Sequence, residues 1–255
     1  MDQVSQQDTG KADAIVVASG FQAFNPVGRP RYGYGINRNV ITALELEQML
    51  REKGEVVRPS DNTIPNSVAF IQCVGSRDHQ LQHAFCSQVC CGYAMRMAEA
   101  MYHRHPETKI SIFYMDIQNC GKNFTEFYER CKDHIRFVRF MPGDIFQGEQ
   151  DRPILYYGDE QDGRSVKEAF DLVVLSVGIM PAPGNAALAE MLNLDLDKQG
   201  FFALVDPLDR TSTKQQGIFL AGTAQGPKDI ADSMIQAGQA AQRAAEYLET
   251  MAGLK

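Results

Sequence analysis

The sequence predicts an α/β protein in which one strand-and-helix domain is inserted into another. Two observations predict this class. Short apolar runs that close at a glycine recur near both ends of the chain, and strand-like and helix-like segments alternate between them. Such alternation is typical of βαβ units with a parallel sheet. A length of 255 residues allows one large domain or two modest ones.

Three apolar runs are expected to form buried strands of the outer domain, because each is short and ends in a tight turn. They are residues 12–19 before Gly20, 171–177 before Gly178, and 217–221 before Gly222. Two helices accompany them. A capping box of Thr42 and Glu45 predicts a helix over 43–53, and Asp229 can cap an alanine-rich helix over 230–250. We therefore expect a discontinuous outer domain of residues 1–57 and 160–255.

The inserted domain is expected to comprise residues 58–159. Its predicted strands are 68–74, 109–115 and 136–140, and its predicted helices are 85–103 and 123–132. The second helix opens with Asn123 and Glu126 in the spacing of a capping box. The order strand, helix, strand, helix, strand predicts a small parallel sheet of the nucleotide-binding type.

Charge and composition exclude several classes of protein. Lys and Arg number 25 against 32 Asp and Glu, for a net charge of −7, and no basic stretch suits a nucleic-acid partner. Hydrophobic residues at 44% and charged residues at 22% are ordinary for a globular domain. No apolar run approaches the roughly 18 residues of a membrane span, and no export signal is recognisable. These features predict a cytoplasmic protein.

The strongest chemical signal is a group of cysteines. Cys73, Cys86, Cys90 and Cys91 lie within nineteen residues, out of six cysteines in the chain. Cys73 lies near the carboxyl end of a predicted strand, and the other three lie at the start of the following predicted helix, where open α/β sheets bind ligands. Residues four apart share a helix face, so Cys86 and Cys90 are expected to contact one object, with Cys91 rotated by about 100°.

Four thiolates spaced in this way suit the corners of a [4Fe–4S] cluster better than a single ion. A structural zinc site more often uses paired C-x2–4-C spacings, which are absent here. The plainer alternatives are buried core cysteines and a Cys90–Cys91 disulfide. Cys120 and Cys131 have no companions and are interpreted as ordinary thiols.

No dinucleotide fingerprint is found in this sequence. The one G-x-G, Gly33-Tyr34-Gly35, has no strand directly before it and no third glycine. We interpret it as a turn and expect no nicotinamide site. The sequence also shows no candidate for acid–base catalysis, so no catalytic residue is predicted.

Several motifs together resemble one family. FIQCVGSRD at 70–78, FCSQVCCGYAMRMA at 85–98, YGYGINRNVITALELEQML at 32–50 and AGTAQGPKDI at 221–230 resemble the A-subunit family of heterodisulfide reductases. That family includes the A and B subunits of the quinone-interacting membrane-bound oxidoreductase complex. The resemblance runs over nearly the whole chain from about residue 12.

The resemblance implies a thioredoxin-reductase-like, two-domain flavoprotein whose inserted domain carries a [4Fe–4S] cluster. It implies Cys73, Cys86, Cys90 and Cys91 as the cluster ligands. Family members have a lysine near the flavin five residues after the second of the paired cysteines, and Arg96 occupies that position here. The other residues for which the resemblance implies FAD contacts are Gly20, Gly178, Gly222, Gln225, Gly226, Lys228 and Asp229.

The family's amino-terminal G-x-G-x-x-G segment, which binds the ADP half of FAD, is absent from this sequence. We therefore expect FAD to be shared with a missing segment or a second chain. The predicted function is an electron-transfer subunit that passes electrons between FAD and the cluster to a partner. The expected partners are other subunits of a redox complex, or a second copy of the chain. The alternatives are a flavin-free iron–sulfur scaffold and a dithiol oxidoreductase related to the pyridine-nucleotide disulfide enzymes.

Overall fold

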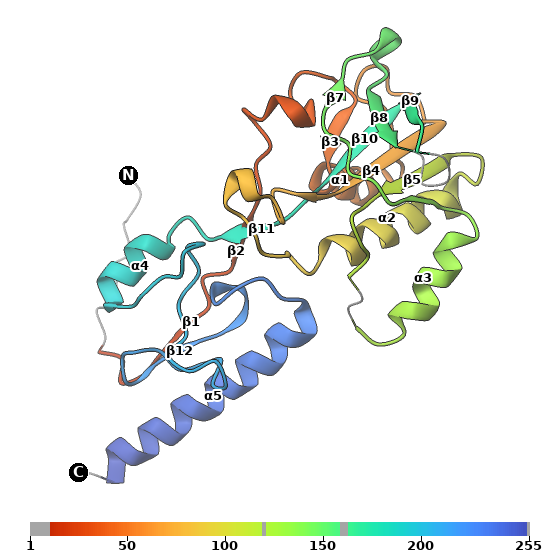
Figure 1. Ribbon diagram of the computed structural model, residues 1–255. Helices are drawn as coiled ribbons and strands as arrows, with labels where there is room; N and C mark the ends of the chain where they lie inside the picture. The colour runs from red at the N-terminus through yellow and green to blue at the C-terminus, as the bar shows by residue number, and fades with distance from the viewer. Residues whose placement is uncertain (1–10, 119–120, 159–162, 254–255) are drawn as a thin grey trace, which may run out of the picture. The chain divides into compact units, whose positions relative to one another are not determined.

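The computed structural model describes residues 11–118, 121–158 and 163–253. The chain forms two compact units (Figure 1). Unit 1 comprises the chain up to Gln22 together with the chain from Pro181 onward, and unit 2 comprises Ala23–Met180. The chain crosses from one unit to the other within β2 (Phe21–Ala23) and within β11 (Ile179–Pro181).

Unit 2 is built on a five-stranded parallel sheet with the order β3-β10-β4-β5-β6. Its strands are β3 (Val40–Thr42), β10 (Leu172–Val177), β4 (Ser67–Val74), β5 (Lys109–Phe113) and β6 (Arg136–Val138). The neighbouring strands β4 and β10 are buried almost throughout. Parallel strands covered on both faces are near-continuous apolar runs, and this explains why these segments were recognisable in the sequence.

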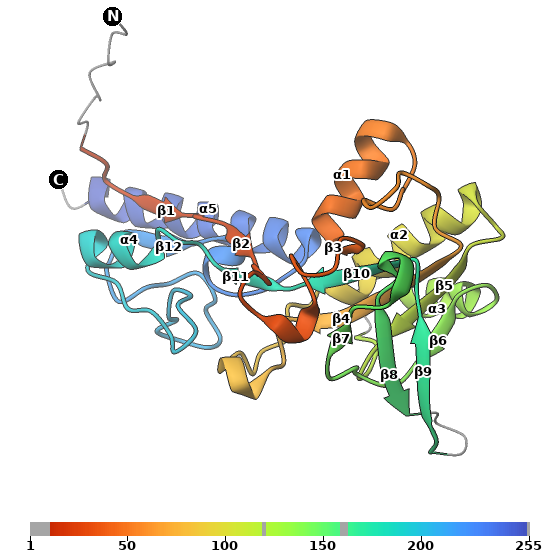
Figure 2. The ribbon, with the colours of Figure 1, turned by 90° about the horizontal axis from the view of Figure 1, so that it is seen from above.

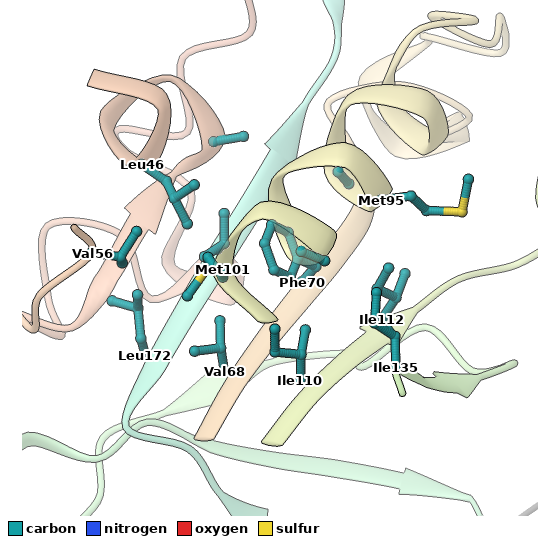
Figure 3. Close-up of a cluster of buried hydrophobic side chains, with 14 of the residues drawn as sticks. Leu46, Val56, Val68, Phe70, Met95, Met101, Ile110, Ile112, Ile135 and Leu172 are labelled. Carbon is teal, nitrogen blue, oxygen red and sulfur yellow. The ribbon is translucent and has the colours of Figure 1, made fainter. Parts of the chain in front are cut away.

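Three helices belong to the layer on one face of this sheet, as Figures 1 and 2 show. They are α1 (Ala43–Lys53), α2 (Cys90–Arg104) and α3 (Phe124–Lys132). The apolar side chains between helices and sheet include Leu46, Phe70, Met95, Ile112 and Leu172 (Figure 3). The capping box of α1 is confirmed, because the Glu45 carboxylate accepts from the Thr42 N–H at 2.6 Å and the Thr42 hydroxyl accepts from the Glu45 N–H at 3.3 Å.

A small antiparallel sheet covers the other face of the parallel sheet (Figure 2). It consists of β7 (Ile145–Phe146), β8 (Ile154–Gly158) and β9 (Ser165–Ala169). Leu155, Tyr157 and Phe170 pack there against the parallel strands. The central strands are therefore shielded from water on both faces.

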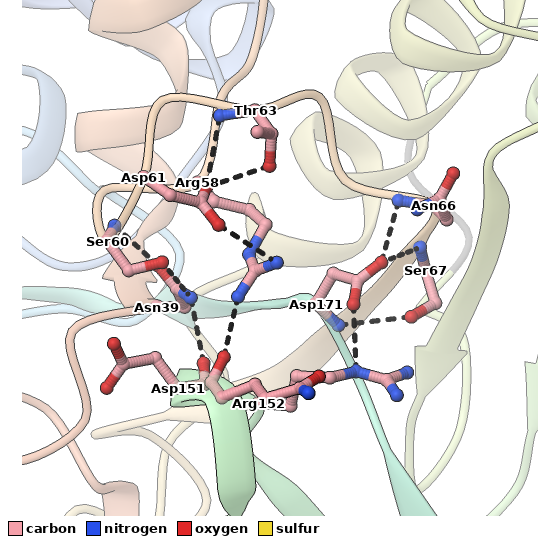
Figure 4. Close-up of polar contacts among 11 residues, drawn as sticks. Asn39, Arg58, Ser60, Asp61, Thr63, Asn66, Ser67, Asp151, Arg152 and Asp171 are labelled. Carbon is pink, nitrogen blue, oxygen red and sulfur yellow. Dashed lines mark hydrogen bonds and ion pairs between the residues drawn. The ribbon is translucent and has the colours of Figure 1, made fainter.

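Polar side chains join the amino ends of the parallel strands (Figure 4). The Asp171 carboxylate, just before β10, accepts from the backbone N–H groups of Asn66 and Ser67 at 2.8 and 3.2 Å. Its other oxygen pairs with the Arg152 guanidinium at 2.9 Å. Asn39, just before β3, donates at 2.8 Å to the backbone carbonyl of Asp151. These contacts fix the end of the sheet opposite the cysteines.

Unit 1 contains a parallel pair of strands and two helices. They are β1 (Ile15–Val17), β12 (Ile218–Leu220), α4 (Asn185–Leu192) and α5 (Ile230–Gly253). The predicted cap of α5 is confirmed, since the Asp229 carboxylate accepts from the Asp232 N–H at 2.7 Å. Among the described residues, no helix combines the length and apolar character that crossing a bilayer requires.

The unit boundaries differ from the domain boundaries expected from sequence. Expected were an outer domain of 1–57 and 160–255 and an insert of 58–159, but β3, α1 and β10 lie in unit 2. The reason is long-range pairing, because β10 lies between β3 and β4 in one sheet. The predicted cap at Asn123 is wrong as well: its φ is +62°, and its side chain forms no capping hydrogen bond.

Candidate functional site

A β-bulge at the carboxyl end of β4 positions Cys73. Gln72 and Cys73 stand opposite the single residue Ser176 of β10. The flanking Ile71 and Val74 both pack in the apolar cluster on the β7–β9 face. Because side chains alternate along a strand, the extra residue turns both Gln72 and Cys73 toward the helix face. Cys73 adopts a left-handed backbone with φ of +56°.

The paired cysteines begin α2, which covers this same face of the sheet. The thiols of Cys90 and Cys91 lie 3.7 Å from the Val177 carbonyl oxygen and 4.0 Å from the Asp116 carbonyl oxygen, respectively. The first N–H groups of a helix lack partners within it and carry the positive end of its dipole. The beginning of α2 therefore favours negative charge on these two sulfur atoms.

Cys86 lies in the loop before α2. The helix predicted over 85–103 begins only at Cys90, so the expectation that Cys86 and Cys90 share a helix face is wrong. Gln88 has a left-handed φ of +63°, and the buried Ser87 hydroxyl accepts from the Ile179 N–H at 2.8 Å. The left-handed residue and this hydrogen bond keep residues 86–88 out of the helix and against β11. The Cys86 sulfur accepts from the Gln88 N–H at 3.2 Å.

The structure brings the four cysteines together. Burial raises the pKa of the Cys73 thiol to about 12, and the neighbouring Cys91 and Cys86 contribute to the rise. Burial also raises the pKa of Cys90, with additional contributions from Cys73 and Cys91. All four are free thiols, and so is the buried Cys131. Cys120 lies outside the described residues.

The donor set fits an iron–sulfur cluster by its chemistry. Soft thiolates select Fe–S clusters, copper(I) or zinc over harder ions. Within residues 11–118, 121–158 and 163–253, no three or more His, Cys, Asp or Glu side chains are grouped closely enough to hold one metal ion. A cluster with four separate iron atoms needs its thiolates further apart than a single ion does. The four thiols are neighbours, and their soft sulfur donors match the ligands of such a cluster in chemical type.

An ion pair that the sequence did not reveal lies beside these thiols. The Arg77 guanidinium donates to both carboxylate oxygens of Asp116, in the loop after β5. The Arg77 N–H donates to the Phe85 carbonyl at 3.0 Å, so this arginine also joins the loop that carries Cys86. The positive charge of Arg77 opposes the upward shift of the Cys73 pKa. The Asp116 carboxylate acts in the opposite direction on the Cys73 pKa, with a smaller effect than that of Arg77. The pair therefore leaves an excess of positive influence next to thiols that must lose their protons to bind metal.

Gly178 follows β10, and its missing side chain has a steric explanation. A Cβ atom there would lie 2.4 Å from the Ser87 hydroxyl oxygen and 3.2 Å from the Ser76 Cβ. The glycine therefore lets the Cys86–Ser87 loop approach the strand end. The family resemblance implied a flavin contact for Gly178, whereas its contacts in unit 2 belong to the cysteine loop. Arg96, also in unit 2, is exposed on α2, and its guanidinium lies over Gly92.

The remaining residues implied for FAD lie in unit 1, at the carboxyl ends of β1 and β12. Gly20 follows β1, and the 3-10 turn Gly222–Ala224 follows β12. A Cβ at Gly20, Gly222 or Gly226 would meet no other atom within 4 Å, so each faces open space. Small residues beside open space, followed by the amino end of α5, form a surface that a phosphate or flavin oxygen can approach.

Lys228 organises this loop from inside. Its ammonium group donates to the carbonyl oxygens of Gly222 at 2.5 Å and Gly226 at 3.0 Å, and to the Gln225 side-chain oxygen at 3.3 Å. Burial lowers the pKa of Lys228 to about 8, and the charge of Arg210 contributes to the fall. Lys228 therefore shapes the loop for which the family resemblance implied FAD contacts.

Comparison with known proteins gives a consistent family. The chain is 42% identical over 243 residues to the second iron-sulfur A subunit of CoB–CoM heterodisulfide reductase from Methanopyrus kandleri, covering 92% of this chain and 37% of that protein. It is 40% identical over 251 residues to the A subunit of the H2:CoB-CoM heterodisulfide,ferredoxin reductase from Methanothermobacter thermautotrophicus, covering 96% and 38%. The chain belongs to the heterodisulfide reductase A-subunit family. It spans less than two-fifths of the length of these relatives. No family model matches the chain.

Solved structures confirm the thioredoxin-reductase-like α/β fold that the family resemblance implied. Thioredoxin reductase of T. acidophilum has a TM-score of 0.58 at 15% identity, covering 96% of this chain and 68% of that one. The Lactococcus lactis enzyme has a TM-score of 0.57 at 17% identity, covering 93% and 66%. At these identities the likeness establishes the fold of this family member and nothing further.

Three residues near the cysteines of this family member went unnoticed in the sequence. Gln72 and Ser176 are polar residues inside the apolar runs FIQCV and LVVLSV, and Asp116 follows a strand. For Gln72 and Ser176, the sequence signal that could have revealed a role was an uncharged polar residue inside an otherwise apolar strand. The partners that these side chains face come from distant parts of the chain, so the sequence did not show their position beside the cysteines.

Proposed function

We propose that this chain is the electron-transfer part of a heterodisulfide reductase A-type protein, in which FAD and a [4Fe–4S] cluster exchange electrons with a partner protein. The observation that carries the proposal is the group of four neighbouring free thiols at the bulge of β4 and the beginning of α2. When bound, the cluster supplies a one-electron carrier and FAD supplies a carrier of one or two electrons.

In this proposal Cys73, Cys86, Cys90 and Cys91 hold the cluster. Three of these residues are buried and Cys86 is half-buried, so the side chains exclude bulk water from most of the site. The beginning of α2 and the Arg77 guanidinium provide positive charge that favours the thiolate forms. The bulge keeps Cys73 on the face that α2 covers.

The flavin part of the proposal rests on unit 1. Gly20, Gly222 and Gly226 would leave room for FAD, Lys228 and Gln225 would hold the loop in shape, and Asp229 would fix the beginning of α5. The N–H groups at that helix end would stabilise negative charge on the flavin. Arg96 would contribute a permanent positive charge to the electron-transfer region.

We propose other subunits of a redox complex as partners. Large apolar side chains on the first turns of α5, namely Ile230, Met234 and Ile235, are 62–80% exposed. Exposed apolar surface of this kind is typical of a protein contact. The five described cysteines are free thiols, which favours a reducing compartment such as the cytoplasm.

Anaerobic reconstitution with iron and sulfide tests the cluster. The wild-type chain and Cys131→Ser are expected to take up about four irons and four sulfides per chain and to give a cluster EPR signal on reduction. Cys73→Ser and Cys90→Ser are expected to lose most of this iron. Cys131 is the matched control, because it is a buried free thiol of the same unit.

Adding FAD to the reconstituted chain separates the rival functions. A brown protein that binds FAD supports electron transfer, and a brown protein without affinity for FAD supports a flavin-free scaffold. A colourless protein in which Cys90 and Cys91 titrate as a two-electron couple would support the dithiol oxidoreductase and overturn the proposal.

A further inference from the structure

A buried glutamine next to the first cysteine has no hydrogen-bond partner. Gln72 is 0% exposed, yet neither its amide nitrogen nor its amide oxygen is paired within the described chain. Buried side-chain amides almost always have partners, and an unpaired one opposes folding. A missing bonding partner is therefore the first explanation to test.

The position of Gln72 indicates what that partner is. The bulge of β4 turns Gln72 and Cys73 to the same face of the sheet, opposite Ser176. The Ser176 hydroxyl is also completely buried, and the neighbouring Tyr93 hydroxyl, which donates to the Val177 carbonyl at 2.8 Å, lies within its reach. The unpaired Gln72 amide thus lies at the cysteine end of the sheet, on the side of α2.

The rest of this face is apolar. Val68 and Phe70, which precede Gln72 on the same side of β4, belong to the hydrophobic cluster under α2. An apolar side chain at position 72 would continue that cluster without leaving an amide unpaired. An amide at this position is therefore unfavourable to the chain alone and becomes favourable when an acceptor occupies the cysteine site.

We propose that the Gln72 side-chain amide donates a hydrogen bond to a sulfur atom of the iron–sulfur group held by the four cysteines, and that this bond raises the group's reduction potential. The inference rests on the proposed function, because it requires the cluster. A donor to cluster sulfur stabilises the reduced form more than the oxidised form, because the reduced form carries more negative charge. Gln72 is a positioning and tuning residue, not a ligand.

The test compares Gln72→Met with wild type, using the full chain. Methionine has similar length and volume but no N–H group. The control is Thr108→Val, which removes a buried side-chain hydrogen bond of 3.0 Å to the Pro65 carbonyl at the opposite end of the same sheet. Each reconstituted protein is titrated anaerobically with dithionite while the EPR signal of the reduced cluster is followed.

Gln72→Met is expected to load iron and sulfide like wild type. At a fixed solution potential, its ratio of reduced to oxidised cluster is expected to be about tenfold lower, which corresponds to a reduction potential about 59 mV lower for a one-electron couple. Thr108→Val is expected to leave the potential unchanged. Without the cluster, Gln72→Met is expected to unfold at a higher temperature than wild type, because no amide is buried unpaired. A merely structural role would lower this temperature and leave the potential unchanged.

A Gln72→Met protein that loads fully at an unchanged potential overturns the inference and leaves the proposed function intact. Failure of wild type itself to load iron overturns the proposed function instead. If Gln72→Met does not fold, Gln72→Asn withdraws the amide by one methylene and is expected to lower the potential as well. An unchanged potential in that variant overturns the inference equally.

Discussion

Replacing Gly178 by alanine tests how the cysteine loop is held against the sheet. The new Cβ would lie 2.4 Å from the Ser87 hydroxyl oxygen, so the loop must move. Overpacking of this kind costs about 1–3 kcal/mol. Because the Ser87 hydroxyl would move, its 2.8 Å hydrogen bond from the buried Ile179 N–H would also be lost, at a further cost of about 1 kcal/mol. We therefore expect Gly178→Ala to lower the free energy of unfolding of the cluster-free chain by about 2–4 kcal/mol.

Urea unfolding under reducing conditions, followed by circular dichroism, measures this change. Gly143→Ala is the control, because a Cβ at Gly143 meets no atom within 4 Å. Ser87→Ala removes the oxygen that clashes, so its cost and that of Gly178→Ala should not add, with a coupling of about 1 kcal/mol or more. Additive costs, or a Gly178→Ala protein within about 0.5 kcal/mol of wild type, would refute the steric explanation. Ser87 follows Cys86, so iron uptake by Gly178→Ala should fall as well.

Three further changes probe other parts of the chain. Thr42→Ala removes the cap of α1 and should lower the free energy of unfolding by about 1 kcal/mol, measured with urea. Asp171→Ala leaves two backbone N–H groups and Arg152 without their acceptor at the amino end of the sheet and should cost about 1–3 kcal/mol by the same measurement. The third concerns pH. Above pH 8 the folded chain loses a Lys228 proton that the unfolded chain keeps until about pH 10.5, so this lysine adds stability as pH rises from about 8 to 10.5. Relative to Lys228→Met, wild type should gain up to about 3 kcal/mol across that range in urea titrations.

Each of these expectations has a clear contrary outcome. A Thr42→Ala chain as stable as wild type would show that α1 is held by packing alone. An Asp171→Ala chain with unchanged stability would show that water replaces the carboxylate at no cost. A constant difference between wild type and Lys228→Met from pH 8 to 10 would mean that Lys228 titrates at its ordinary pKa.

Local patterns predicted the elements that depend on local causes. The apolar runs became β1, β4, β10 and β12, and the helix beginning after Thr42 has the predicted bounds, since its cap involves residues three apart. The grouping of the cysteines was also expected from their spacing, and the structure brings them together. Their role as cluster ligands stays a prediction.

Features that depend on distant partners were not predictable. Helix α2 begins at Cys90 and not at the predicted residue 85, because the Ser87 hydroxyl accepts a hydrogen bond from the backbone N–H of Ile179, 92 residues away. The bulge at Gln72 and Cys73 exists only through pairing with β10, about a hundred residues further along the chain. For the same reason β3 and β10 were assigned to the wrong part of the molecule, since nothing local shows that they border β4.

The polar contacts at the amino end of the parallel sheet bear on how the protein matures. Asp171, Asn39 and their partners, and the apolar layers on both faces of the sheet, involve none of the four clustered cysteines. The sheet and the two layers that cover it therefore do not depend on iron or sulfide for these contacts. Iron and sulfide would then bind to a sheet that is already folded. Cys86 is half-buried whereas the other three clustered cysteines are buried, so its sulfur would be the first that they reach.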